Sequence, residues 1–231
     1  MSEIVNLKDL RFGWKRTEPA VLDIPDFSVK RGESVFIHGP SGSGKSVLLS
    51  LIAGILQPQS GSVVVCGTRI DALSGSARDA FRADRIGFIF QRFNLIPYLT
   101  PFDNVLIPCE LSGRRRAEAG VPLEKARDLL TRLDLPPALW DRRAAMLSVG
   151  EQQRVAAARA LIGAPDLIIA DEPTSALDSD RREGFLRLLL SLRASSSLIF
   201  VSHDLSLAGA FDRTAAIGEI SRIREDRSCA A

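Results

Sequence analysis

The chain has 231 residues, of which 45% are hydrophobic and 25% are charged. This composition is ordinary for a globular protein and excludes a wholly disordered chain. The 30 Lys and Arg residues nearly balance the 28 Asp and Glu residues, which leaves a net charge of +2. A dedicated nucleic-acid-binding domain is expected to be strongly basic, so we expect no nucleic-acid partner.

The cysteine pattern and the hydropathy pattern predict a cytoplasmic chain. Cys66, Cys109 and Cys229 are widely spaced and fit neither a disulfide framework nor a zinc site. The N-terminus lacks the features of a signal peptide. The longest apolar run, residues 47–56, is shorter than the roughly 20 residues that a membrane span needs. We therefore expect that the chain itself does not cross a membrane.

The first third of the chain is typical of short strands separated by Gly and Pro. The predicted strands are Ile4–Leu10, Val21–Val29, Ser34–His38, Val63–Cys66 and Ile86–Phe90. A helix over Lys45–Ile55 follows the third of them.

The pattern becomes helical between about residues 92 and 165, a stretch that contains a predicted helix over Glu151–Leu161. A second apolar helical face is predicted from Leu123, Ala126, Leu129, Leu130 and Leu133. The last third alternates between strands and helices, namely Leu167–Asp171, Arg181–Arg193, Leu198–Ser202 and Asp204–Phe211.

The alternation predicts an α/β fold with a mostly parallel sheet that is covered on both faces. The N-terminal strands are expected to form an antiparallel β part, and residues 92–165 a helical insert. We interpret residues 1–231 as a single domain.

A glycine-rich segment joins a predicted strand to a predicted helix and fits the phosphate-loop pattern G-x-x-x-x-G-K-[ST] in full. It reads Gly39-Pro40-Ser41-Gly42-Ser43-Gly44-Lys45-Ser46. The glycines allow backbone N–H groups to surround an anion, and the following helix N-terminus adds its dipole. Lys45 is expected to reach the β- and γ-phosphates, and the Ser46 hydroxyl to bind Mg²⁺. The alternative is a turn that merely connects the strand and the helix.

Two carboxylates end the apolar strand Leu167–Asp171. Because parallel strands end at one edge of the sheet, Asp171 is expected to lie beside the phosphate loop. Asp171 can then hold Mg²⁺ while Glu172 activates water. An acidic turn without such a role is the alternative. The two elements together predict a nucleoside triphosphatase.

Four further segments, in their order along the chain, resemble motifs of the ATP-binding cassette (ABC) proteins. They are Gln91, Leu147-Ser148-Val149-Gly150-Glu151-Gln152-Gln153-Arg154, Ser175-Ala176-Leu177-Asp178 and His203. They are similar to the family's Q-loop, signature, D-loop and switch histidine, and the resemblance covers nearly the whole chain. It implies ATP and Mg²⁺ as cofactors and a homodimer as the working unit.

The resemblance also implies roles for these residues. Ser148 and Gly150 would bind the γ-phosphate held by the opposite subunit, although Ser148 with Glu151 also forms a capping-box pattern. Gln91 would offer its side-chain oxygen to Mg²⁺ or to the attacking water, and His203 would contact the γ-phosphate. A solvated glutamine and a structural histidine are the alternatives. Asp178 would belong to the nucleotide site through the D-loop.

Adenine binding and two departures from the family pattern complete the site prediction. Trp14 stands near the place where the family stacks adenine on an aromatic ring; Phe12 and a core role for Trp14 are alternatives. Val47 replaces a hydroxyl that usually follows the phosphate loop, which removes one contact to the α-phosphate. Val149 replaces the first signature glycine and adds bulk near the γ-phosphate. Both carboxylates are present, so an active enzyme is expected.

The stretch Ile86–Pro97, followed by Thr100 and Asp103-Asn104-Val105, is similar to the ATPases of lipoprotein-releasing, macrolide-efflux and cell-division complexes. That similarity implies peripheral attachment to the cytoplasmic face of the inner membrane and docking of a permease subunit on Phe93–Leu99. A periplasmic adaptor would act through the permease. Residues 93–99 could instead be core of the insert. The alternative functions are a signalling ATPase that regulates cell-wall enzymes and a non-transport ABC ATPase.

Two basic segments are given no catalytic role. Arg114-Arg115-Arg116 is expected to form a solvated helix face or loop, with anionic lipid as the alternative. The tail after Gly218, with Arg222, Arg224 and Arg227, is short and polar, and we expect no regulatory domain there.

Overall fold

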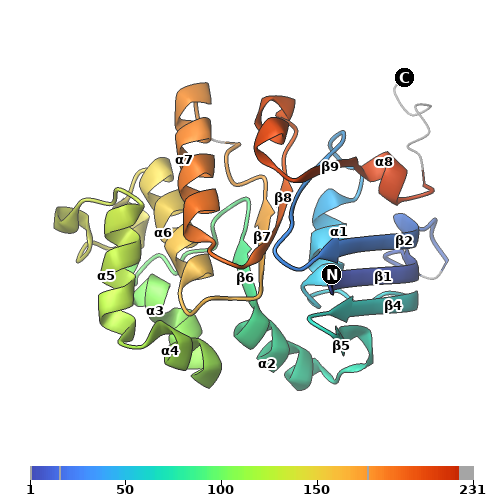
Figure 1. Cartoon of the computed structure of the whole chain (residues 1–231), viewed down its shortest axis with the longest axis horizontal. Helices are drawn as coiled ribbons and strands as arrows, with labels where there is room; N and C mark the ends of the chain where they lie inside the picture. The colour runs from blue at the N-terminus through green and yellow to red at the C-terminus, as the bar shows by residue number, and fades with distance from the viewer. Residues whose placement is uncertain (1, 16, 176, 224–231) are drawn as a thin grey trace.

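Two β-sheets of different kinds organise the chain in the computed structural model, which describes residues 2–15, 17–175 and 177–223 (Figure 1). Ala176, Arg224, Arg227 and Cys229, all named above, lie outside the described residues. The antiparallel sheet has the order β2–β1–β4–β5, with β1 (Glu3–Phe12), β2 (Leu22–Lys30), β4 (Ser60–Val65) and β5 (Thr68–Arg69). The parallel sheet has the order β6–β7–β8–β3–β9, with β3 (Ser34–His38), β6 (Ile86–Ile89), β7 (Leu167–Asp171), β8 (Ser197–Val201) and β9 (Arg213–Ala216).

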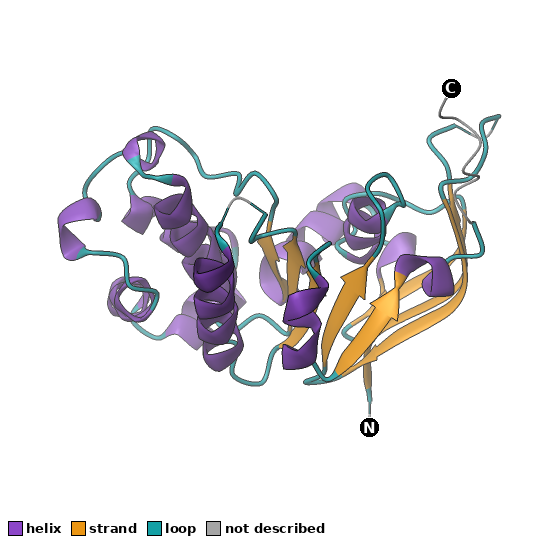
Figure 2. Ribbon diagram, turned by 90° about the horizontal axis from the view of Figure 1, so that it is seen from above, coloured by secondary structure: helices purple, strands orange, loops and turns teal. Residues whose placement is uncertain are grey.

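Helices surround the parallel sheet and form the end of the molecule farthest from the antiparallel sheet (Figures 1 and 2). The α-helices are α1 (Lys45–Ile52), α2 (Gly75–Arg85), α3 (Pro101–Leu111), α4 (Gly113–Ala119), α5 (Pro122–Arg132), α6 (Val149–Leu161), α7 (Ser179–Leu192) and α8 (Ile217–Ile220). Short 3₁₀ helices are η1 (Ile70–Ala72), η2 (Pro137–Leu139), η3 (Ala144–Met146) and η4 (Leu205–Ala210).

The register of the parallel sheet brings the ends of three strands level with one another. Ile37 of β3 and Asp171 of β7 both pair with Val201 of β8. The loops that follow these strands therefore leave the sheet side by side. This edge is where the sequence predicts the phosphate loop, the paired carboxylates and the histidine.

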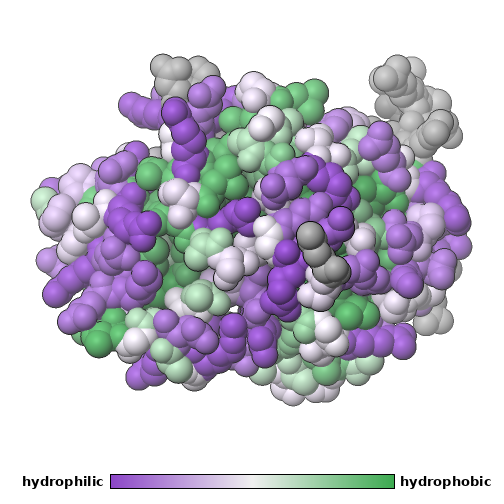
Figure 3. All heavy atoms as spheres, viewed as in Figure 1, coloured by the Kyte–Doolittle hydropathy of each residue, from purple (hydrophilic) through white to green (hydrophobic). Residues whose placement is uncertain are grey.

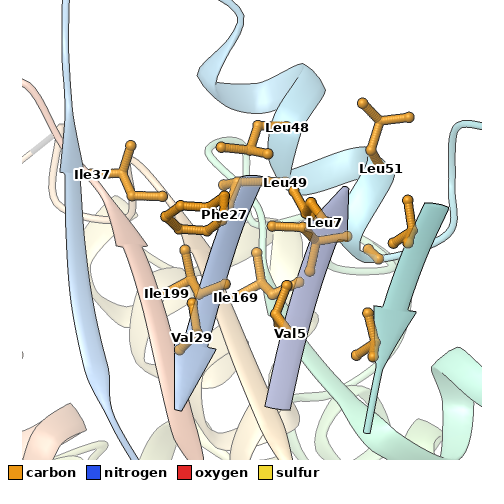
Figure 4. Close-up of a cluster of buried hydrophobic side chains, with 14 of the residues drawn as sticks. Val5, Leu7, Phe27, Val29, Ile37, Leu48, Leu49, Leu51, Ile169 and Ile199 are labelled. Carbon is orange, nitrogen blue, oxygen red and sulfur yellow. The ribbon is translucent and has the colours of Figure 1, made fainter. Parts of the chain in front are cut away.

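Two hydrophobic cores cover the two faces of the parallel sheet. Because side chains alternate along a strand, Ile169 of β7 faces α1 and the antiparallel sheet, whereas Ile168 and Ala170 face the helical part of the chain. Figure 4 shows the first core, in which Leu48 and Leu49 of α1 lie near strands of both sheets. The phosphate loop is thus fixed through α1 to a buried layer.

Most of the predicted strands and the helices α1, α5, α6 and α7 are confirmed, with end shifts of a few residues. The helix predicted over Asp204–Phe211 is instead the 3₁₀ helix η4, which Asp204 caps by accepting from Ser206 N. Leu123 is 54% exposed and does not belong to the buried face of α5, since it lies in the first turn, beyond the core.

Helix α2 and strand β9 were not predicted, and the reason is physical. None of the residues of α2 is buried, so the helix lacks the apolar stripe from which helices are recognised. Strand β9 has four residues and carries Arg213 and Thr214 in its first half. Its parallel pairing with β3, rather than its own sequence pattern, makes it a strand.

The prediction of a solvated basic cluster at residues 114–116 is wrong. Arg114 pairs with Asp166 (Nη2–Oδ2 3.1 Å), and Arg115 is buried. The Arg115 guanidinium donates to carbonyls at the C-terminal end of α6, including Ala160 O at 2.7 Å. The last carbonyls of a helix lack intrahelical donors, and Arg115 supplies donors to them. Arg116, the third arginine of the cluster, remains exposed.

Among residues 2–15, 17–175 and 177–223, the helices are all too short or too polar to span a bilayer. The face of the molecule in Figure 3 is mostly hydrophilic, with hydrophobic residues scattered between charged ones.

Three arginines converge on Asp166, immediately before β7, and generate a pH-dependent prediction. Arg31, Arg85 and Arg114 each lie within 3.2 Å of its carboxylate. Burial alone would raise the pKa of Asp166, but hydrogen bonds and charges from these arginines outweigh it and lower the pKa. A lowered pKa in the folded state stabilises the fold above the unfolded-state pKa of about 3.9, and this contribution is lost as the pH falls through the folded-state value.

We therefore expect Asp166→Asn to lower the free energy of unfolding by about 1–3 kcal/mol at pH 7. The deficit relative to the unmodified chain should narrow below about pH 4. Urea denaturation at pH 7 and below about pH 4 measures this deficit in the free energy of unfolding. Asp128→Asn removes a carboxylate from an exposed ion pair and serves as the control, with a change within about 1 kcal/mol. An equal deficit for Asp166→Asn at both pH values would contradict the electrostatic explanation.

Candidate functional site

The phosphate loop, residues 39–46, runs from the end of β3 into α1. Gly42 and Gly44 adopt φ of 83° and 90°, a region that favours glycine. A Cβ on Gly44 would also lie 2.8 Å from Leu22 Cδ2. No side chain caps the N-terminus of α1, so its first N–H groups remain available to an anion.

The ammonium group of Lys45 is fixed inside the phosphate loop. Lys45 is buried, and its Nζ donates to Gly39 O at 2.9 Å and to Pro40 O at 2.6 Å. Both carbonyls belong to the loop itself and hold the ammonium within it. The loop can therefore bind polyphosphate with both a fixed cation and backbone donors.

Asp171 ends β7 beside this loop and carries an unusual carboxylate. Burial raises the pKa of Asp171, and the charge of Glu172 adds to the effect, while the nearby Ser46 hydroxyl and the Lys45 ammonium oppose it. Its Oδ1 is buried and has no hydrogen-bond partner among the described residues. A buried carboxylate oxygen without a donor, next to a serine hydroxyl, fits a bound divalent cation.

Glu172 adopts a left-handed conformation at the strand end, with φ of 43°, and its N–H donates to Val201 O at 3.0 Å. A left-handed non-glycine residue at a strand end is unusual and typical of functional sites. Its Oε2 lies 3.3 Å from Nδ1 of His203, which follows β8. A carboxylate and an imidazole in contact, one residue beyond Asp171, can take part in proton transfer to and from a water molecule.

Gln91 follows β6 by two residues and is exposed. Within the described part of the chain, no hydrogen bond joins its side chain to Ser46 or Asp171. The adjacent Phe93, expected on a docking surface, is buried in the core of the helical part. That part of the docking prediction is wrong, because Phe93 and Asn94 both adopt left-handed conformations that fold Phe93 inward.

Trp14 follows β1 and is 63% exposed, which rules out the core alternative. Its ring meets the buried Phe12 ring edge to face, with centroids 5.3 Å apart. Trp14 is therefore free to stack on a planar group, while Phe12 is not. Val47 of α1, also expected at the nucleotide, is half-buried against the first core.

Ser148 is the N-cap of α6. Its Oγ accepts from Glu151 N, and Glu151 Oε2 accepts from Ser148 N at 2.7 Å. The predicted capping box is thus confirmed, and it leaves the backbone at Gly150 accessible. Val149 is half exposed at the same tip.

A cavity of about 310 Å³ adjoins this tip, and Ser148, Gly150, Leu177 and Arg181 are among its lining residues. Asp178 is the exposed N-cap of α7 and accepts from Arg181 N.

The predicted site residues thus fall into separate groups. Residues 39–46, Asp171, Glu172 and His203 meet at one edge of the parallel sheet. Ser148 and Gly150 lie at the start of α6, on the other side of β7 from α1 along the long axis of the molecule (Figure 1). The cavity beside Ser148 and Gly150 includes none of residues 39–46 in its lining.

Comparisons with known proteins identify the family. The model of the ABC transporter family matches residues 22–175. An uncharacterized ABC transporter ATP-binding protein of Mycobacterium tuberculosis (strain H37Rv) is 43% identical over 217 residues, covering 91% of this chain and 85% of its own length. The lipoprotein-releasing system ATP-binding protein LolD of Syntrophotalea carbinolica is 40% identical over 216 residues, covering 92% of each chain.

A solved structure agrees with these relatives. The dimeric ATP-binding cassette MJ0796 bound to ADP and Pi superimposes with a TM-score of 0.84 at 35% identity, covering 94% of this chain and 96% of that chain. This chain therefore belongs to the ABC transporter family: it is the ATP-binding subunit of a transporter, and it hydrolyses ATP. The predicted fold class and the family resemblance are both confirmed.

Sequence reasoning missed one surface near this site. A groove of about 400 Å³ lies between α2, β6 and α3; its lining residues include Phe88, Ile107 and Leu111. Leu111 is 70% exposed. The sequence feature that could have indicated this surface is Leu111, an apolar residue directly before Ser112, the N-cap of α4.

Proposed function

We propose that this chain powers a transporter of the export or lipoprotein-releasing type. It would act as a head-to-tail homodimer attached to a permease at the cytoplasmic face of the inner membrane, with a periplasmic adaptor acting through the permease. The observation that carries the proposal is the sheet edge that joins Lys45, the unpaired Asp171 oxygen and the Glu172–His203 contact. Similarity to LolD supports the transporter type.

In this proposal the phosphate loop binds ATP through its backbone N–H groups and through Lys45, whose ammonium faces the β- and γ-phosphates. Trp14 stacks on adenine. Ser46, Asp171 and Gln91 hold Mg²⁺, which when bound neutralises phosphate charge. Gln91 reaches this set after a shift of its exposed side chain.

Hydrolysis is assigned to the Glu172–His203 pair. Glu172 accepts the proton of the attacking water, and His203 contacts the γ-phosphate while it positions the Glu172 carboxylate. Their 3.3 Å contact supports this division of roles. Val47 supplies no hydroxyl to the α-phosphate, so binding depends more on Lys45 and the backbone.

The dimer supplies what one chain lacks. Ser148 and Gly150 of one subunit face the phosphate loop of the other, where the N-terminus of α6 meets the γ-phosphate. Asp178 lies beside the same interface through the D-loop. This arrangement has two-fold symmetry and uses each surface twice. Val149 at the tip adds a stiff side chain that slows closure relative to glycine.

The groove between α2, β6 and α3 is the proposed seat of the permease. It is lined mainly by apolar side chains with a few polar ones, a composition that suits the apolar face of a partner helix. It lies along β6, whose end leads directly to Gln91. Docking there couples the permease to the Mg²⁺ site more directly than docking on the buried Phe93.

Glu172→Gln tests the catalytic assignment. The amide cannot accept a proton, so we expect kcat for ATP hydrolysis to fall at least about a hundredfold, with ATP affinity retained. Light scattering should show an ATP-dependent dimer. Glu124→Gln makes the same change at an exposed position of α5 and should behave like the unmodified chain. Near-normal turnover in Glu172→Gln would refute the role.

Leu111→Asp tests the docking groove. A charge on this exposed leucine should weaken the affinity for the permease at least about tenfold, because docking would bury it unpaired. The melting temperature should stay unchanged. Leu123→Asp alters another exposed leucine of the helical part, outside the groove, and is the control. Binding is measured on detergent-solubilised membranes; equal binding by both variants would place the permease elsewhere.

A further inference from the structure

Arg159, on α6, is a half-buried cation that contacts the segment containing Gln91. Its Nη1 donates to Asn94 O at 2.7 Å, and its Nη2 donates to Phe93 O. Burial lowers the pKa of Arg159 to about 10. Among the described residues it forms no ion pair, so backbone carbonyls are its partners. Burying a guanidinium without a carboxylate is unfavourable. We therefore expect Arg159 to have a specific role at this position.

The segment that it holds is strained. Phe93 and Asn94 are consecutive non-glycine residues with φ of 58° and 47°, a conformation that L-residues avoid. We call residues 91–94 the Q-loop turn. Phe93 N also donates to Phe90 O at 2.9 Å, which makes the turn tight. Such a turn persists only when its surroundings hold it, and the two donors of Arg159 bind both left-handed residues at their carbonyls.

We propose that Arg159 is a positioning residue that fixes the Q-loop turn on α6, and thereby sets where Gln91 can reach. The inference rests on the proposed assignment of Gln91 to Mg²⁺. Ser148 is the N-cap of α6. In the proposed dimer, the Q-loop turn of a chain serves that chain's own nucleotide site, whereas the N-terminus of its α6 serves the site of the partner. The guanidinium of Arg159 therefore joins elements of two nucleotide sites. Arg159 also lines the groove between α2, β6 and α3, where a docked helix would touch it.

The chain contains a matched control. Arg115 is more deeply buried than Arg159 but also donates to backbone carbonyls, and burial likewise lowers its pKa to about 10. It lines the same groove. Its acceptors, however, are the carbonyls of Ile86, Arg159, Ala160 and Ile162, all of which lie outside the Q-loop turn. A merely structural role for Arg159 predicts that lysine substitutions at the two sites behave alike.

The test measures the Mg²⁺ dependence of ATP hydrolysis at saturating ATP in the full-length chain, together with melting temperatures. Arg159→Lys keeps the charge but replaces two nitrogens held in one plane with a single ammonium on a shorter side chain. We expect its apparent Mg²⁺ affinity to weaken about tenfold, as in Gln91→Ala. Arg115→Lys should lower the melting temperature comparably and leave the Mg²⁺ affinity unchanged. The double variant Arg159→Lys/Gln91→Ala should be no weaker than Gln91→Ala alone.

Three outcomes separate the possibilities. A normal Mg²⁺ affinity in folded Arg159→Lys, with a weakened one in Gln91→Ala, overturns this inference and leaves the proposed function intact. Additive losses in the double variant also overturn it, because Arg159 would then act independently of Gln91. A normal Mg²⁺ affinity in Gln91→Ala overturns the assignment of Gln91 itself, and this inference with it.

Discussion

The hydrogen-bonded register of β3, β8 and β7 is the constraint on which the candidate site depends. Because Ile37 and Asp171 both pair with Val201, the phosphate loop, the carboxylate pair and the segment with His203 emerge at the same height. A slip of one residue would turn the alternating side chains to the opposite face and exchange the two cores. Packing of both faces therefore fixes the geometry of the edge without any contribution from a ligand.

That edge is half of a nucleotide site in the proposed function. It offers a cation, backbone donors and an unpaired carboxylate oxygen, but the signature residues lie beyond β7 at the start of α6 (Figure 1). In the proposed function, the separation of the two halves in one chain would give ATP a mechanical role, because its γ-phosphate would bring two chains together. The contact of Arg159 with the Q-loop turn joins that turn to α6, the helix that carries the signature residues, and we propose that it links the two halves of each chain.

Strands β3, β6, β7 and β8 of the parallel sheet could be predicted from sequence because their signals are local. Strand β7 is five apolar or acidic residues between breakers, and the phosphate loop has a fixed spacing. Features set by tertiary contacts could not be predicted in this way. Phe93 is apolar whether it faces a partner or the core, and the left-handed turn determines that it faces the core. Arg115 seemed solvated because its acceptors lie about 45 residues away in sequence. The sequence signal at Arg159 is a charge within a run of alanines.

The central claim, that each site is built from two chains, is tested most directly by mixing two inactive variants. Lys45→Ala damages the phosphate loop, and Ser148→Arg damages the signature. A mixed dimer then has one site damaged in both halves and one intact site. We predict that an equimolar mixture recovers ATP hydrolysis, up to about a quarter of the unmodified activity if chains pair at random. No recovery, with mixed dimers demonstrated by two affinity tags, would contradict the account.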